Sequence, residues 1–228
     1  MTLSNRNILY LFIYLWLFGV IIAAFMLPNQ VGMLRETTTN MYFHVSMAIT
    51  ATVAFLTSLW QSVRYLITRD LHFDYGAEAS AGLGYLFNLL ALITGAIWAR
   101  YAWGAYWHWD PRQTSIFILL IIYSVYFVLR GSVEDPEKRG RLSAVYSIFS
   151  FPSLIFLYYV LPRLVPGLHP GSPERGEAGI NPAVSNTTDP EIRVILYSAW
   201  AGFIALFFVL YHLRLRYLKL HHSLNHNN

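Results

Sequence analysis

The residues best suited to chemistry are a cluster of tryptophans in one short segment. Residues 103–114 read WGAYWHWDPRQT and hold three of the 7 tryptophans of the chain. Indole rings gathered in this way form a flat, apolar surface that suits a large planar ligand, and Gly104 would let a ligand approach the backbone. If residues 103–107 are helical, Trp103 and Trp107 share one face. The alternative is an aromatic belt at the lipid headgroups, but belts are spread over several spans.

Two histidines flank this segment in the sequence, His44 and His169. The chain has no cysteine, so thiolate metal sites and covalent thioether attachment through its own residues are excluded. A single histidine is more often an ordinary polar residue. Two neutral imidazoles, however, are good ligands for haem iron, with the tryptophans against the edge of the macrocycle.

The residues that follow the tryptophans predict the start of a helix. Asp110 precedes Pro111, and Gln113 lies three residues after Asp110, which is the pattern of an N-cap, a first-turn proline and a capping box. Arg112 in the first turn opposes the helix dipole, and an anionic ligand there would relieve the conflict. Arg112 is therefore the first candidate for binding haem propionates, ahead of three other arginines, Arg35, Arg100 and Arg163.

The composition indicates the elements that must position these residues. The chain has 228 residues, 56% hydrophobic and only 12% charged, against about a quarter charged in soluble domains, which disfavours a simple soluble enzyme. A membrane-spanning helix needs about 20 apolar residues, and the runs lack the alternation of barrel strands. We predict an all-α integral membrane protein that forms a single membrane domain over 1–228. Its six spans fall at about 8–27, 43–65, 79–98, 111–130, 142–161 and 193–213.

The basic residues predict the orientation of these spans. With the N-terminus inside, ten of the 16 lysines and arginines lie on the inner side, so both termini are expected in the cytoplasm. These residues would meet anionic lipid, which explains the basic charge without nucleic acid. The outer side then carries both histidines, the tryptophan-rich segment 99–113 and a proline-rich loop at 162–192. Residues 220–228 are expected to be a disordered tail.

The segment 103–110 resembles the tryptophan-rich WWD signature of haem-handling proteins in cytochrome c maturation. The stretch Gly95-Ala96-Ile97-Trp98 before it, the six spans and the placement of the histidines also fit, and the chain is similar over nearly its whole length to the heme exporter protein C (CcmC) type. The wider WWD-domain family also includes CcmF and CcsA. The resemblance places the two axial haem ligands on His44 and His169. It places the other haem contacts on Trp103, Gly104, Trp107, Trp109, Asp110 and Arg112. The chain departs from many relatives at Thr39, Ser46 and Pro170, where they have arginine, proline and glutamine.

The resemblance implies haem handling rather than an enzyme activity. Haem b would be bound transiently and without a covalent bond at the periplasmic face of the inner membrane. It would then pass to a periplasmic haem chaperone of the CcmE type. The implied partners are ABC transporter subunits of the CcmA and CcmB types and a small single-span subunit of the CcmD type. Two alternatives remain, a subunit of a cytochrome c synthase (haem lyase) and a non-haem membrane transporter subunit. The second is disfavoured because transporters place ionisable residues within their spans, and the predicted spans have almost none.

Overall fold

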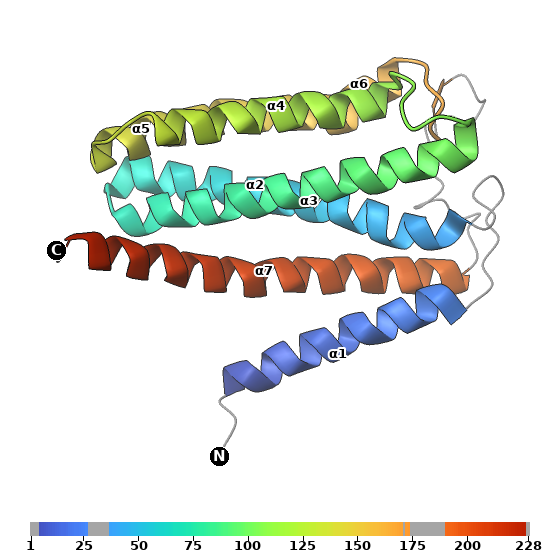
Figure 1. The fold of residues 1–228 in the computed structure, drawn as a ribbon, viewed down its shortest axis with the longest axis horizontal. Coiled ribbons are helices and arrows are strands. Elements are labelled where there is room, and N and C mark those ends of the chain that lie inside the picture. Colours follow the sequence, from blue (N-terminus) through green and yellow to red (C-terminus); the bar gives the residue numbers. More distant parts are fainter. Residues whose placement is uncertain (1–4, 27–36, 171, 174–189, 227–228) are drawn as a thin grey trace.

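The computed structural model of the protein describes residues 5–26, 37–170, 172–173 and 190–226. Within these residues it is all helical, and six stretches of helix are long and apolar enough to cross a membrane, which confirms the predicted fold class. The helices lie side by side along one long axis (Figure 1). Their bounds are α1 Asn5–Met26, α2 Thr38–Thr68, α3 Leu71–Trp103, α4 Pro111–Gly131, α5 Pro136–Ile155, α6 Leu161–Leu164 and α7 Pro190–His226.

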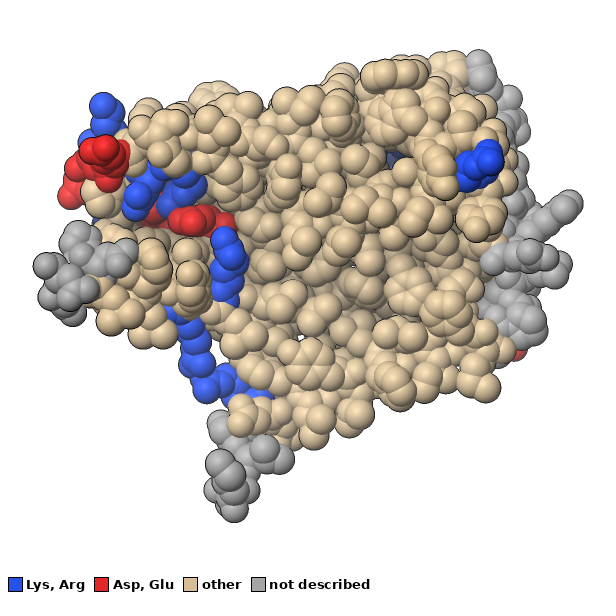
Figure 2. Space-filling model, in the orientation of Figure 1, with Lys and Arg blue, Asp and Glu red and all other residues tan. Residues whose placement is uncertain are grey.

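Both described chain ends lie at the same end of the bundle, and the connection between α3 and α4 lies at the other end (Figure 1). Figure 2 shows most of the charged side chains of this face near the end with the termini, while its middle is uncharged. This distribution matches a bundle whose central band faces hydrocarbon and whose polar ends face water. That the termini face the cytoplasm stays a prediction from the basic residues.

Side-chain caps start three of the helices. Asp70, Asp110 and Asp135 each accept a hydrogen bond from a backbone N–H in the first turn of α3, α4 and α5. The predicted start at Pro111 is therefore confirmed. Helix α3 ends at Trp103, because Gly104 adopts φ 88°, a left-handed conformation that suits glycine.

The helices extend beyond the predicted spans, because an apolar window marks the hydrocarbon core and not the end of a helix. Helix α3 begins at Leu71, so Asp74 and Glu78 lie inside it, although the predicted span began at 79. Helix α7 runs to His226, so residues 220–226 are helical and the expected disordered tail is wrong for them. No proline or glycine follows Gly202 to stop α7. Residues 227–228 lie outside the described residues.

The centre of the bundle is held by close packing of small against aromatic residues. A Cβ atom added at Gly84 of α3 would lie 2.7 Å from the Phe55 ring of α2. That ring stacks on Tyr123 of α4 with centroids 3.6 Å apart. Small residues that let helices approach are the usual means of association in a membrane, where the hydrophobic effect does not drive packing.

The fifth span is irregular near its end opposite the chain termini. A π-helical turn, Phe156–Val160, separates α5 from α6, and it follows Pro152 inside α5. Proline removes one helical hydrogen bond, and a π turn is one way in which a helix adjusts. The turn carries Tyr158 and Tyr159, which line the cavity described next.

Candidate functional site

A cavity of about 320 Å³ lies among the helix ends opposite the termini. Residues from α2, α3, α4, α6 and α7 line it, together with the π turn and the segment after α6. The lining includes both predicted histidines, His44 and His169, and two arginines, Arg112 and Arg163. The structure therefore brings together His44 and His169, which are 125 positions apart in the sequence, in a mostly apolar site of the size that binds small molecules.

His44 lies in the second turn of α2, which begins at Thr38, earlier than the predicted span of 43–65. Its Nδ1 is 3.0 Å from the carbonyl oxygen of Ala91 and 3.2 Å from the hydroxyl of Thr94, both on α3. A carbonyl only accepts, so Nδ1 carries the proton and Nε2 keeps the lone pair. A Cβ atom added at Gly95 would lie 2.8 Å from Cε1 of the ring. Helix α3 therefore fixes the imidazole by a hydrogen bond and by a glycine.

His169 lies in a tight turn beyond α6. Its Nδ1 is 2.9 Å from Oδ1 of Asp110, and the backbone N–H of Leu168 donates to Oδ2 of the same carboxylate at 2.7 Å. Within the turn, the N–H of Gly167 donates to the hydroxyl of Ser172, and the N–H of Ser172 donates to the carbonyl of His169. The turn is thereby fastened to the start of α4.

Asp110 is the residue that joins these two elements. It is only 3% exposed, and it also accepts a hydrogen bond from the N–H of Arg112 as the N-cap of α4. Burial by itself raises the pKa of a carboxyl group. The hydrogen bond and charge of His169 and two backbone N–H donors outweigh burial and hold the pKa of Asp110 at about 2. Asp110 is therefore an anion at neutral pH and faces His169.

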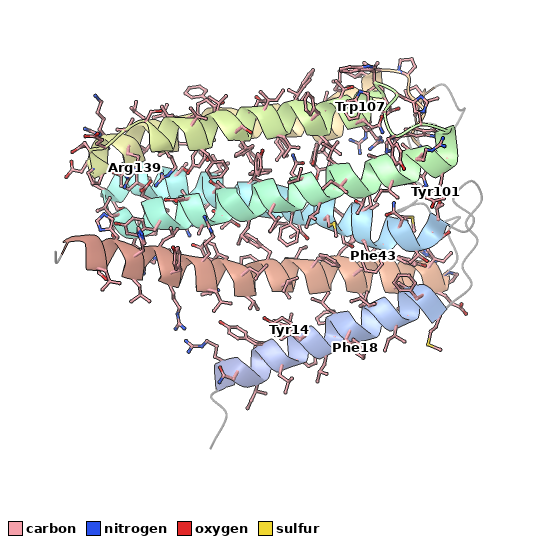
Figure 3. The ribbon with its side chains drawn as sticks, in the orientation of Figure 1. Tyr14, Phe18, Phe43, Tyr101, Trp107 and Arg139 are labelled. Carbon is pink, nitrogen blue, oxygen red and sulfur yellow. The ribbon has the colours of Figure 1, made fainter. Side chains whose placement is uncertain are left out.

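The tryptophans of the predicted platform divide into two groups. Trp103 packs edge-on against His169, with ring centroids 5.1 Å apart, and against Trp98 at 4.9 Å. Trp107 and Trp109 instead contact each other, 5.4 Å apart, and Trp109 is 71% exposed. Figure 3 shows Trp107 at the same end of the bundle as Tyr101 and far from Arg139.

The expected common face of Trp103 and Trp107 is not formed, because α3 ends at Trp103 and the chain leaves the helix at Gly104. None of Trp103, Trp107 and Trp109 is among the described residues that line the cavity. Trp103 packs against the ring of His169, which does line it, while Trp107 and Trp109 pack against each other.

Arg112 and Arg163 both line the cavity. Within the described residues, neither Arg112 nor Arg163 forms an ion pair with a carboxylate, and the Arg163 guanidinium donates to the carbonyl of Tyr159. Of the other arginines considered, Arg100 donates to the carbonyl of Gly104 and does not line the cavity. Arg35 lies outside the described residues. Two guanidinium groups in an apolar site suit a ligand with carboxylates.

Several lining residues were missed in the sequence. Trp98 lines the cavity, and its indole donates to the hydroxyl of Thr37. Its position in the stretch before the tryptophan segment was a sequence signal that could have identified it. Tyr158, Tyr159 and Trp200 line the cavity from the fifth and sixth spans, where nothing in the local pattern marks them. The side-chain polar atoms of Ser115 and Trp200 are buried and have no partner among the described residues. The cavity therefore offers donors that a ligand could satisfy.

Comparisons with known proteins give concordant matches. The family model described as "CcmC: Heme exporter protein C" matches residues 2–227. The chain is 34% identical over 175 residues to heme exporter protein C of Paracoccus denitrificans, covering 77% of this chain and 70% of that protein. It is 35% identical over 131 residues to heme exporter protein C of Rhodobacter capsulatus, covering 58% of this chain and 54% of that protein. It is also 34% identical over 96 residues to cytochrome c biogenesis protein CcsA of Panax ginseng, covering 42% of this chain and 29% of that protein.

Proposed function

The chain belongs to the heme exporter protein C family, and from this premise we propose that it binds haem between His44 and His169 and presents it for transfer. Family membership supports a role in haem handling during cytochrome c biogenesis. The observation that carries the finer proposal is that both histidines line one cavity together with two arginines. Haem is the cargo of the protein, bound as haem b without a covalent bond, and the protein acts as a carrier and not as an enzyme.

The residues present fit this cargo. The Nδ1 atoms of both imidazoles contact protein oxygen atoms, which assigns iron ligation to Nε2 in each ring. Arg112 and Arg163 match the two propionates of a haem, because a guanidinium pairs with a carboxylate through two donors. Trp98, Tyr158 and Trp200 supply apolar and aromatic surface for the macrocycle.

The position of the site also fits transfer. The cavity lies at a bundle end, and one ligand is on a helix while the other is on a turn. We place this end at the periplasmic face of the inner membrane, from the distribution of basic residues. The proposed partners, which family membership implies, are a periplasmic haem chaperone of the CcmE type, transporter subunits of the CcmA and CcmB types, a small subunit of the CcmD type and membrane lipid.

Gly95→Ala should weaken haem binding about tenfold or more. The new methyl group would lie 2.8 Å from Cε1 of His44, inside the carbon contact distance of about 3.5 Å, so the imidazole must move from its hydrogen bond. Haem titration of the purified protein, followed by its visible absorbance, measures the change. The control is Gly19→Ala on α1, where an added Cβ meets no described atom within 4 Å. Equal affinity in the two variants would contradict this account of His44.

Trp107→Ala combined with Trp109→Ala should slow haem transfer to the chaperone by about tenfold and leave haem binding nearly unchanged. These rings contact each other and lie outside the cavity lining, so they form a surface that a partner can contact. Purified haem-loaded protein is mixed with a CcmE-type chaperone, and haem on the chaperone is measured over time. Trp60→Ala is the control, since Trp60 is an exposed tryptophan elsewhere on the bundle. Unimpaired transfer by the double variant would refute this role.

A second candidate function is a subunit of a cytochrome c synthase. The similarity to CcsA of Panax ginseng favours it, although the chain covers only 29% of that protein. The two functions differ in their product. A synthase would leave haem covalently attached to an apocytochrome c in the absence of a chaperone, whereas a carrier would not.

A further inference from the structure

The two histidines of the cavity have different partners. The Nδ1 of His169 contacts a buried carboxylate, that of Asp110, at 2.9 Å. The Nδ1 of His44 contacts the neutral oxygens of Ala91 and Thr94 at 3.0 and 3.2 Å. The partner of one ring nitrogen changes how strongly the other nitrogen can donate to a metal.

We propose that Asp110 is a positioning residue that orients His169 and makes it the stronger of two unequal axial ligands. This inference rests on the proposed function of the site and gives Asp110 a role through His169, not a contact with haem. A carboxylate hydrogen-bonded to a ligating imidazole fixes its tautomer and raises its basicity. A carbonyl or hydroxyl partner fixes the tautomer with less effect on basicity, because it carries no charge.

The contacts of the Asp110 carboxylate hold His169 in one position. One oxygen, Oδ1, receives both the His169 ring and the N–H of Arg112, while Oδ2 receives the N–H of Leu168. A Cβ atom added at Gly167 would lie 2.8 Å from Oδ2, so the turn is also fitted closely to the carboxylate. The start of α4 thereby fixes both the ring and the backbone that carries it.

The unequal donor strengths of His44 and His169 determine the order in which the two histidines release haem. His44 sits on the long helix α2 with a neutral partner, whereas His169 is held by a charge-assisted contact. The bond from iron to His44 is then the weaker one and breaks first. The haem face on the α2 side becomes available to the acceptor while His169 keeps the other face.

The test is Asp110→Asn, which keeps the size of the side chain and an acceptor for the N-cap but removes the charge. We expect haem affinity to fall about 10–100-fold, as for other outer-shell partners of metal ligands. We also expect a positive shift of the haem midpoint potential in the fraction that stays loaded, because a weaker donor stabilises ferric iron less. A redox titration followed by visible absorbance measures the potential.

The matched control is Asp135→Asn, the same change at the N-cap of α5, where the side chain accepts from the N–H of Lys138. It should leave both affinity and potential unchanged. If Asp110→Asn lowers thermal stability but leaves the potential of the loaded protein at the wild-type value, Asp110 is only a helix cap and the inference fails.

A measurement on haem-free protein separates this inference from the proposed function. In protein labelled with ¹⁵N-histidine, the Nδ1 resonance of His169 should shift in Asp110→Asn and stay in place in Asp135→Asn. An unmoved resonance would overturn the inference even if haem binds. Failure of the wild-type protein to bind haem, with the resonance shifted as expected, would instead refute the proposed function.

Discussion

Replacing both His44 and His169 with alanine should abolish the haem absorbance of the purified protein. The two rings line one cavity, and each presents Nδ1 to a protein oxygen, so both are oriented for ligation through Nε2. Loss of an outer-shell partner alone costs about 10–100-fold in metal affinity. Removal of both ligands should therefore lower haem affinity by more than about 100-fold. A titration with haem, followed at the Soret band, measures this directly.

The control for this experiment is His212→Ala. His212 is an exposed histidine on α7, far along the helix from the cavity, and its Nδ1 contacts the carbonyl of Phe208. Wild-type affinity and spectrum are expected for this variant. Each single variant, His44→Ala or His169→Ala, should keep some haem with an altered spectrum, because one axial ligand remains. A double variant that binds haem with the wild-type spectrum would exclude these residues as ligands.

Arg130→Met should destabilise the folded protein by about 3–5 kcal/mol, the cost of removing one partner of a buried ion pair. Arg130 donates to both carboxylate oxygens of Asp74, at 2.7 and 2.9 Å, and to Glu78 at 2.8 Å. Asp74 is only 2% exposed, so the variant leaves a buried carboxylate without its cation. Unfolding of the protein in detergent, followed by near-ultraviolet circular dichroism, measures the loss.

Two further variants make this prediction specific. Arg216→Met alters an exposed arginine on α7 and should change stability by less than about 0.5 kcal/mol. Arg130→Met combined with Asp74→Asn should recover part of the lost stability, since the uncompensated charge is then removed. If Arg130→Met is as stable as Arg216→Met, the ion pair does not hold α3 to α4. Haem affinity should be similar to wild type in all three, because the pair lies away from the cavity lining.

The sequence by itself determined the fold class and the number of spans, and it singled out the two histidines that the structure places in one cavity. These follow from local properties, because a bilayer requires about 20 apolar residues for each helix and satisfies no exposed backbone. The start of α4 could also be predicted, since a cap, a first-turn proline and a capping residue lie within a few positions of one another.

The ends of the helices could not be predicted in the same way. The helices continue past the apolar windows at Leu71 and at His226, where the residues are polar but compatible with a helix. Hydropathy reports only the solvent around a segment and not its hydrogen bonding. The ion pair of Arg130 with Asp74 was missed for this reason, since one partner lay outside the predicted span.

Only the tertiary structure decided how the candidate site is built. The tryptophans, which are close together in the sequence, have different ring partners in the structure, because α3 ends at Trp103. Residues that are far apart in the sequence, such as Arg163 and Trp200, meet at the cavity. Asp110, which the sequence explains fully as a helix cap, also holds His169. Contacts between helices depend on how their faces are rotated and packed, and no local pattern of residues encodes that rotation.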